Sequence, residues 1–373
     1  MSGSMTRLLA QFDEQAHGLL AAHKVPGIAI GVIDGGRVAA YRCHGVADTR
    51  TGAPIEPDTC FNVASISKSV TAWGVMRLCE AGQVHLDAPV GEYLKRWRLP
   101  PSTFDVRAVT VRRLLAHTAG INLSGCSASL LSTPKAGLLD ILNGNMLPLD
   151  AAQVAYSNVW DVPLDSYNVP VRIEYEPGVG YHYSGGGYTM LELLIEDVSG
   201  RGFAEFMREQ LLQPLNMRRA TFDPTPHPHF AVGHDSNGAP LGAYRTNGLA
   251  AGGMFCSIED LCTFALAGMP GGQGDSAGRG VVTPESLAQM HRPEVDAEYY
   301  GRLLLRYGLG HNVYTTRGAT VVGHTGGNLG WRSVFWIVPA LGKGVAMLLN
   351  GAGGNEVWQT LMRAWPAQVF ASD

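Results

Sequence analysis

Ser65-Ile-Ser-Lys68 places a hydroxyl and an amine three residues apart, at the start of an apolar segment. Residues i and i+3 of a helix lie on one face, so the Lys68 amine can reach the Ser65 hydroxyl. A serine hydroxyl is a weak nucleophile until a neighbouring group takes its proton. The chain has only five lysines, so an amine beside a candidate nucleophile is informative. The pattern predicts nucleophilic catalysis by Ser65 with Lys68 as its proton partner.

The same pattern recurs at Ser132-Thr-Pro-Lys135, in a different context. The residues after Lys68 supply a broad apolar surface, and Gly82 is suited to end a helix. Ser65 therefore stands at the positive end of a buried helix predicted over 66–81, where developing negative charge is favoured. At the second match, the threonine and proline are typical of an N-cap and a first helical residue. That match indicates an ordinary helix start.

A tyrosine in a glycine-rich turn is the next candidate. Tyr183-Ser-Gly185 follows Glu176-Pro-Gly and precedes a predicted helix over 187–198. Such a turn can hold a phenol at the edge of a cleft, and beside an ammonium the phenol can act as general base or acid. Tyr156-Ser-Asn158 is an alternative, but it has neither a preceding Pro-Gly nor a following helix.

A glycine-rich stretch with a histidine, His324-Thr-Gly326-Gly327, follows a predicted strand near the C-terminus. Glycines at a strand end let a substrate approach the backbone closely. A backbone N–H at such a place can help to form an oxyanion hole.

Taken in order, these three motifs resemble the triple motif of the serine β-lactamase and penicillin-binding-protein superfamily. They are most similar to its class C β-lactamase-type branch, which also holds family VIII esterases, D-amino-acid peptidases and acyltransferases. The resemblance covers nearly the whole chain except about residues 122–170 and 224–245. Further stretches that carry it are Val25-Pro-Gly-Ile-Ala-Ile-Gly-Val, Leu114-Leu-Ala-His-Thr-Ala-Gly-Ile121, Glu176-Pro-Gly and Ala250-Ala-Gly-Gly-Met254.

The resemblance implies an α+β fold: an antiparallel sheet flanked by N- and C-terminal helices, plus an inserted, mainly helical lobe. The α/β lobe would comprise residues 1–63 and 209–373, and the helical lobe residues 64–208. It also implies acyl transfer through an acyl-Ser65 intermediate, without a metal or organic cofactor. The implied roles are nucleophile (Ser65), proton partner (Lys68), general base (Tyr183), oxyanion hole (backbone N–H groups of Ser65 and Gly327) and substrate-facing strand edge (His324, Thr325 and Gly326).

Two departures from the family pattern bear on the substrate. Gly185 stands where the tyrosine motif usually ends in asparagine. His324 stands where a lysine usually helps to bind the carboxylate of β-lactams and D-Ala peptides, and a histidine is not reliably cationic at neutral pH. We therefore predict an esterase or acyltransferase. The rivals are a β-lactamase or D-amino-acid peptidase and, in another class, a non-catalytic scaffold or ligand-sensing member of the fold.

Residues 122–170 are predicted to shape the acyl pocket. Four aromatic side chains could form its walls, although they could equally pack the core of the inserted loop: Tyr156, Trp160, Tyr167 and Trp331. His117 follows an apolar helix and is predicted to be a packed structural histidine. His227-Pro-His229 is predicted to be a surface loop, because no acid or cysteine lies nearby to complete a metal site.

Composition limits the remaining possibilities. The 373 residues are 46% hydrophobic and 16% charged, with a net charge of −4, which is typical of a globular protein and gives no electrostatic reason to expect nucleic acid or a membrane as partner. The expected partner is a small-molecule ester or amide. The sequence starts without signal-peptide features, so a cytoplasmic location is the expectation. The six cysteines are scattered, which favours reduced thiols.

The elements that must position these residues follow from the hydrophobic pattern. Strands are predicted near both ends of the chain and helices between them, so both termini contribute to one sheet. The predicted helices cover 6–23, 66–81, 111–117, 134–143 and 187–198, with a closing helix from about 355. The predicted strands cover 27–33, 37–42, 307–313, 320–323, 333–338 and 344–350.

Overall fold

The computed structural model describes residues 1–133, 135–145, 169–223, 225, 229–272, 274–300 and 303–371. Its helices are α1 (Gly3–Ala22), α2 (Ile66–Glu80), α3 (Val111–Leu115), α4 (Leu138–Leu142), α6 (Gly185–Ser199), α7 (Phe203–Met207), α8 (Leu249–Gly252), α9 (Ile258–Ala267), α10 (Pro284–Met290), α11 (Gly354–Met362) and α12 (Trp365–Val369). Its strands are β1 (Gly27–Asp34), β2 (Arg37–Asp48), β3 (Ala53–Pro54), β4 (Phe61–Asn62), β5 (Ser127–Leu130), β6 (Tyr244–Asn247), β7 (Phe255–Cys256), β8 (Val295–Tyr300), β9 (Leu303–Tyr307), β10 (Asn312–Thr316), β11 (Ala319–Asn328), β12 (Trp331–Val338) and β13 (Lys343–Leu349).

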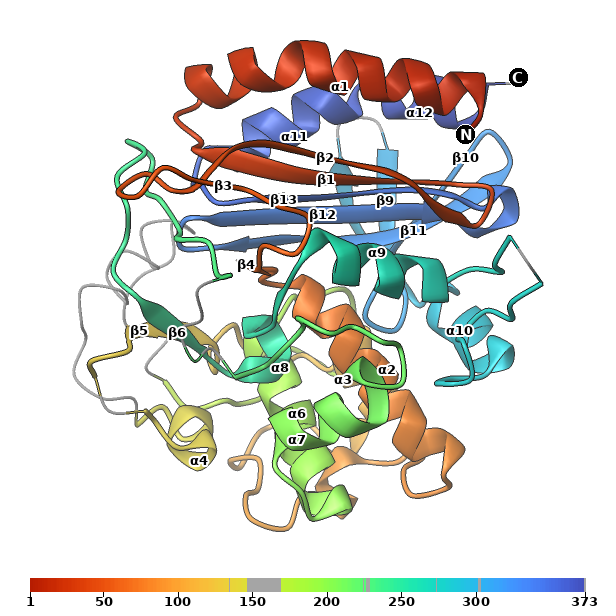
Figure 1. Ribbon diagram of the computed structural model, residues 1–373. Coiled ribbons are helices and arrows are strands. Elements are labelled where there is room, and N and C mark those ends of the chain that lie inside the picture. Colours follow the sequence, from red (N-terminus) through yellow and green to blue (C-terminus); the bar gives the residue numbers. More distant parts are fainter. Residues whose placement is uncertain are drawn as a thin grey trace.

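In the described part of the chain, nine strands form one antiparallel sheet in the order β3-β2-β1-β13-β12-β11-β10-β9-β8 (Figure 1). The first and last strands of the chain are neighbours, with Ile28 opposite Leu349 and Ile33 opposite Gly344. This arrangement confirms the predicted antiparallel sheet assembled from both termini. The predicted lobe boundaries at residues 63/64 and 208/209 stay a prediction.

Helices cover both faces of the sheet (Figure 1). On the face that we call the outer face, α1, α11 and α12 bury one core, to which Phe12, Ile30 and Met347 belong. On the opposite, inner face, α9 and the helical part of the molecule bury a second core that includes Trp73 and Phe335. Because side chains alternate along a strand, the central strands supply both cores, and every residue of β1 and β12 is buried.

The helical part is organised around α2, which packs against α6 and α8. Twelve of the 15 residues of α2 are buried, including Ser67, Lys68 and Ser69. A helix that is buried on nearly all sides has little amphipathic pattern, so its apolar composition, not a polar face, made it predictable.

The predicted strand over 307–313 is wrong. The chain instead forms β9, reverses direction between Gly308 and His311, and returns as β10, so that Tyr307 pairs with Asn312. Gly310 has φ +76°, a left-handed conformation that glycine adopts without strain, and the Gly308 N–H donates to His311 O at 2.8 Å. The two glycines that the pattern placed inside one strand therefore form the turn between two strands.

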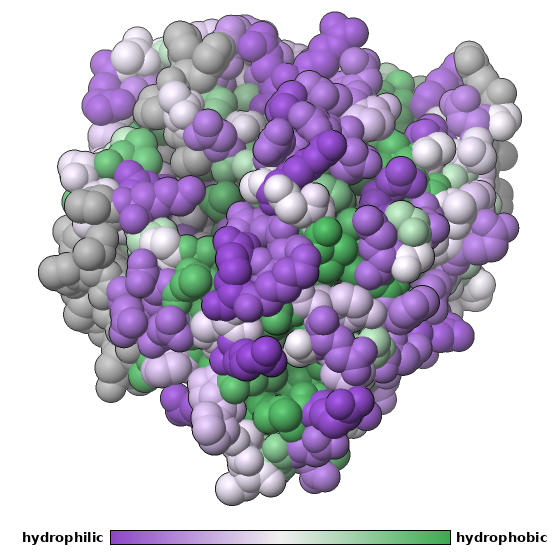
Figure 2. All heavy atoms as spheres, turned by 90° about the horizontal axis from the view of Figure 1, so that it is seen from below, coloured by the Kyte–Doolittle hydropathy of each residue, from purple (hydrophilic) through white to green (hydrophobic). Residues whose placement is uncertain are grey.

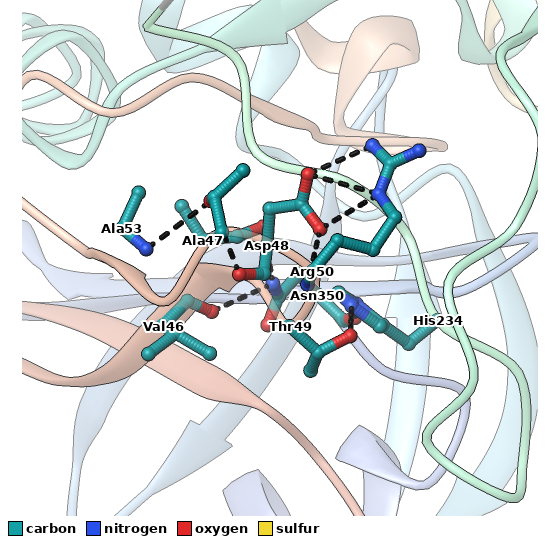
Figure 3. A network of polar contacts seen from close by, with 9 residues as sticks. Val46, Ala47, Asp48, Thr49, Arg50, Ala53, His234 and Asn350 are labelled. Atoms are coloured by element: carbon teal, nitrogen blue, oxygen red, sulfur yellow. Dashed lines mark hydrogen bonds and ion pairs between the residues drawn. The ribbon is translucent and has the colours of Figure 1, made fainter.

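A polar network holds the end of the sheet near the β2–β3 turn (Figure 3). Asn350 Nδ2 donates to Val46 O at 3.0 Å and to Ala47 O at 3.1 Å. His234 Nδ1 donates to Asn350 O at 2.9 Å, and its Nε2 lies 3.2 Å from Thr49 Oγ1. The imidazole thus bonds a backbone carbonyl and a hydroxyl, with no carboxylate, so this network fixes loops and forms no catalytic triad.

Hydrophilic residues dominate the surface at the helical end of the molecule, and hydrophobic residues form separate areas among them (Figure 2). No described helix combines the length and the apolar character needed to cross a membrane.

Candidate active site

Ser65 lies where the short strand β4 turns into α2. It is the N-cap residue of α2, with φ −64° and ψ −10°. Ala64, immediately before it, has φ +48°, a left-handed conformation that is strained for a residue with a Cβ. Asn62 Oδ1 holds this turn by accepting the Ala64 N–H at 3.0 Å. The surrounding structure thus imposes a backbone conformation that sets the orientation of Ser65.

The Ser65 hydroxyl lies within hydrogen-bond distance of two proton-carrying groups. Tyr183 Oη donates to Ser65 Oγ at 2.7 Å, and Lys68 Nζ donates to the same atom at 3.2 Å. Lys68 Nζ also lies 4.7 Å from the centre of the Tyr183 ring. The structure therefore brings together three residues that the sequence separates by up to 118 positions.

Lys68 is buried, with 2% of its surface exposed, and its amine is held by the backbone of α8. Lys68 Nζ donates to Ala251 O at 2.6 Å. Glu192 on α6 supports α8 from the other side by accepting the Ala250 N–H at 2.9 Å. Burial raises the pKa of the Glu192 carboxyl to about 7. The titratable Glu192 thus supports the part of α8 whose Ala251 carbonyl holds the Lys68 amine.

Tyr183 is 36% exposed, and His117 lies beneath it. The centres of the two rings are 4.3 Å apart. His117 O accepts the His182 N–H at 2.8 Å, and His117 Nδ1 accepts the Ser184 N–H at 3.2 Å. One buried residue therefore fixes the backbone on both sides of the tyrosine.

His117 can play this part only when its imidazole is neutral, because Nδ1 must accept a hydrogen bond. Burial, aided by the charge of Lys68, holds the pKa of His117 well below its usual value. His117 is a packed histidine, as predicted, but what it packs against is the tyrosine of the site.

His324 is also a neutral imidazole. It is 3% exposed, and burial is the main reason that its pKa falls to about 3. Its Nδ1 lies 2.5 Å from Thr325 O, so Nδ1 carries the proton and Nε2 accepts a hydrogen bond from Tyr307 Oη at 2.9 Å. At neutral pH this residue supplies no positive charge to a substrate carboxylate.

A cavity of about 370 Å³ opens in front of these groups. Its lining includes Ser65, Lys68, Leu123, Cys126, Tyr181, Tyr183, Gly185, Ala251, Gly252, Glu298, Tyr307, Asn312, His324, Thr325, Gly327 and Asn328. Among these residues Lys68 is the one lysine or arginine. In the described part of the chain, no group of three or more His, Cys, Asp or Glu side chains could hold a metal ion.

The strand β11 presents an open edge to this cavity. β10 pairs with β11 only as far as Gly323, while β12 pairs with it through Asn328. A Cβ at Gly326 would lie 2.3 Å from both Val63 O and Ser333 Oγ, so this glycine lets β11 pack against the segment that leads to Ser65. Ser65 and Gly327 line the same cavity, as an oxyanion hole made by their N–H groups requires.

Gly185 has a physical reason to be a glycine. A Cβ at this position would lie 2.6 Å from the Cβ of Cys126, which is closer than side-chain carbons approach one another. An asparagine side chain cannot occupy this place while Cys126 keeps its position.

Some predicted site residues lie elsewhere. Trp331 does not reach the cavity of Ser65: it is 3% exposed, packs edge-on against Phe61 and Phe255, and lines a separate cavity. Its expected role as an aromatic wall is corrected accordingly. Ser132 lies exposed in the turn after β5, outside the site, and the helix expected from residue 134 begins at Leu138. Tyr156, Trp160, Tyr167 and His227 lie outside the described residues.

The residues that support the site, chiefly Asn62, Glu192, Tyr307 and Asn328, are not among those that the sequence predicts. Asn328 Nδ2 donates to Asn62 Oδ1 at 2.8 Å and to Gly252 O at 3.2 Å, which ties β11, β4 and α8 together around Ser65. Among these four residues, only Asn62 stands close to Ser65 in the sequence, three residues before it, so only its role could have been suspected from the sequence. The other contacts join residues far apart in the chain.

Comparisons with known proteins cover almost the whole chain. The family model described as Beta-lactamase matches residues 7–365. Penicillin-binding protein 4 of Amycolatopsis lactamdurans is 26% identical over 366 residues, which are 95% of this chain and 88% of that protein. Esterase EstB of Burkholderia gladioli is 27% identical over 386 residues, covering 93% of this chain and 90% of that protein.

A solved structure agrees with the sequence relatives. The octameric penicillin-binding protein homologue from Pyrococcus abyssi superposes with a TM-score of 0.73 at 25% identity, over 96% of this chain and 77% of that one. Its fold matches the sheet and helices described above.

Proposed function

We propose that this chain, which belongs to the beta-lactamase family of serine hydrolases, cleaves a carboxylic ester through an acyl-Ser65 intermediate or transfers the acyl group to an acceptor. The observation that carries the proposal is the pair of hydrogen bonds that Lys68 and Tyr183 make to one serine oxygen in an open cavity. A serine with two such neighbours can lose its proton as it attacks.

The proposed reaction has two halves. Tyr183, as general base, takes the Ser65 proton as Oγ attacks the ester carbonyl, and Lys68 orients the Ser65 oxygen. The carbonyl oxygen becomes an oxyanion that the N–H groups of Ser65 and Gly327 stabilise. Tyr183 Oη then returns the proton to the leaving alkoxide, which gives a free alcohol and the acyl-enzyme. Water or another acceptor repeats the sequence at the acyl carbon and regenerates Ser65.

Charge in the cavity supports an ester over a β-lactam or a D-peptide. The last two substrates carry a carboxylate next to the scissile bond. Lys68 is already bonded to Ala251 O and Ser65 Oγ, and His324 is held neutral by burial. Glu298, a carboxylate, lies on the cavity wall. An anionic substrate would therefore gain little and meet a like charge.

Turnover of p-nitrophenyl butyrate tests the proposal. Ser65→Ala should abolish turnover, and Tyr183→Phe should slow acylation by at least about 100-fold, the scale of a lost general base. Circular dichroism should show that both variants remain folded. Ser65→Ala turnover equal to the wild type would refute the assignment. Hydrolysis of a chromogenic cephalosporin as fast as the ester would reverse the ranking of ester over lactam, and a phosphonate probe that labels no serine would favour a non-catalytic member.

A further inference from the structure

A second cavity adjoins the Ser65 cavity at the open edge of β11. It has a volume of about 530 Å³ and lies between the outer face of the sheet and helices α11 and α12; we call it the outer cavity. The two cavities share four lining residues: Glu298, Asn312, Thr325 and Gly327. Since β10 leaves β11 at Gly323, no strand pairing closes the passage along this edge in the described structure.

The outer cavity is lined mainly by apolar and aromatic side chains. They come from the sheet and from the two C-terminal helices, and the largest are Leu305, Tyr314, Trp336, Trp358, Met362 and Trp365. Apolar groups gain free energy by leaving water for such a lining. A chamber of this size and character suits a bulky apolar group of a small molecule.

The position of Tyr183 indicates which part of a substrate reaches this cavity. In the proposed reaction the leaving oxygen must lie beside Tyr183 Oη, which protonates it. Tyr183 contacts His117, whose ring centre is 4.9 Å from that of Tyr307, and Tyr307 bonds to His324 at the start of the open edge. Asn312, which both cavities share, pairs with Tyr307. The leaving group therefore departs on the side of the passage.

The charges at the passage limit what can enter. Glu298 is exposed at the junction of the two cavities. Arg363, the one cationic side chain among the described residues that line the outer cavity, is exposed at the end of α11. A leaving group with a carboxylate near the ester bond would meet Glu298 first.

We propose that the outer cavity binds the alcohol portion of the ester, and that this alcohol is bulky, apolar and not anionic. This inference rests on the proposed function, since it assigns the leaving side of the same site. The acyl portion then lies on the other side of Ser65, toward Leu123, Cys126 and Asn328.

Narrowing the outer cavity tests the preference for size. Gln359 lines the cavity from α11, whereas Glu356, on the same helix, is exposed and does not. Gln359→Trp should lower the ratio of kcat/KM for 2-naphthyl butyrate to that for ethyl butyrate by at least about tenfold, the scale on which apolar pockets discriminate. Glu356→Trp should leave this ratio unchanged. An equal ratio in the wild type and Gln359→Trp would overturn the assignment of the cavity.

Changing the charge at the passage tests the preference for non-anionic alcohols. Butyrylcholine, its uncharged isostere 3,3-dimethylbutyl butyrate, and an analogue with a carboxylate in place of the ammonium keep the acyl group constant. We expect the carboxylate ester to be the poorest substrate. In Glu298→Gln, the ratio of kcat/KM for butyrylcholine to that for 3,3-dimethylbutyl butyrate should fall about two- to fivefold, the effect of losing an exposed charge pair. Asp296→Asn removes the same charge from the same strand outside both cavities and is the control.

Two outcomes separate this inference from the proposed function. If Ser65→Ala abolishes ethyl butyrate turnover but neither Gln359→Trp nor Glu298→Gln changes its ratio, the enzyme acts through Ser65 and the outer cavity is not its alcohol site. If ethyl butyrate turnover persists in Ser65→Ala, the proposed function itself fails. A preference for the carboxylate ester would overturn the charge argument alone.

Discussion

At the scale of single residues, the site depends on hydrogen bonds that hold backbone on either side of a reacting group. On either side of Tyr183, the His182 N–H donates to His117 O and the Ser184 N–H donates to His117 Nδ1. Ala64 is held in a strained conformation directly before Ser65. Such supports act on orientation, and a displacement of about 1 Å can cost about 100-fold in rate.

His117 can be tested with two variants that divide its functions. Asparagine places Oδ1 where histidine has Nδ1, so His117→Asn keeps an acceptor for the Ser184 N–H and tolerates the φ of +57°. His117→Phe keeps a ring and loses the acceptor. We expect His117→Phe to lower kcat for p-nitrophenyl butyrate about 10- to 100-fold with little change in KM, and His117→Asn to lower it less. Equal kcat in all three proteins would show that His117 does not position Tyr183.

Gly185 can be tested against its neighbour. Gly185→Asn introduces the residue that the family usually has at this position, but its Cβ would clash with the Cβ of Cys126. We therefore expect the free energy of unfolding to fall by about 1–3 kcal/mol. Cys126→Gly removes that Cβ and should recover part of the loss in the double variant, whereas Cys126→Ala keeps the Cβ and should not. Urea unfolding of the four proteins measures these differences. A Gly185→Asn protein as stable as the wild type would contradict the steric explanation.

At the scale of elements, the four-residue helix α8 connects a buried acid to Lys68. Glu192 accepts the Ala250 N–H at one side of α8, and Lys68 Nζ donates to Ala251 O at the other. Thr71 Oγ1 also donates to Ala250 O at 3.1 Å, so α2 and α6 both hold this short helix. The lysine is therefore positioned by an element that is too short to be stable alone.

The buried carboxyl gives stability a defined dependence on pH. The pKa of Glu192 rises from 4.5 to about 7 on burial, so between these values the folded protein holds a proton that the unfolded chain has lost. Glu192 should therefore lower the free energy of unfolding by about 3 kcal/mol as pH rises from 4.5 to 7, with no further change above. The difference in stability between pH 5 and pH 8 should shift by about this amount in Glu192→Gln relative to the wild type, whereas Glu205→Gln, an exposed acid on α7, should leave that difference unchanged. Urea unfolding at pH 5 and pH 8 checks both variants, and an unchanged difference in Glu192→Gln would contradict the assignment.

The elements also show why sequence patterns predicted some of the structure and not the rest. The 66–81 helix and the 27–33, 333–338 and 344–350 strands follow from local hydrophobic patterns, and the structure confirms them within a few residues. The turn at Gly308–His311 interrupts an otherwise strand-like pattern, and it is also held from α2 and α10: Ser69 Oγ donates to Gly310 O, and the Leu309 N–H donates to Met290 O. Motifs likewise predicted Ser65, Lys68 and Tyr183, whereas the burial of Trp331 and the contact of Gly185 with Cys126 depend on segments remote in the chain.

At the scale of the whole molecule, the sheet separates two cores that serve different purposes. The outer core joins the first and last segments of the chain through α1, α11 and α12. The inner core surrounds α2 and carries β4, which leads into Ser65. The outer cavity lies where these two halves meet at the edge of β11, so there the outer layer would touch the proposed substrate.

Two matched core substitutions test whether the sheet isolates the site from the outer core. Phe12 and Phe61 are both fully buried, Phe12 in the outer core and Phe61 in the inner core, four residues before Ser65. Each change to alanine should lower the free energy of unfolding by about 3–5 kcal/mol, because each leaves a cavity. Measured well below the unfolding temperature, kcat/KM for p-nitrophenyl butyrate should stay within about twofold in Phe12→Ala but fall at least about tenfold in Phe61→Ala, where the support of the Ser65 turn is lost. If the two variants lost activity equally at equal losses of stability, the sheet would not isolate the site from the outer core. The orientation of Ser65 would then depend on the whole fold and not on the inner core alone.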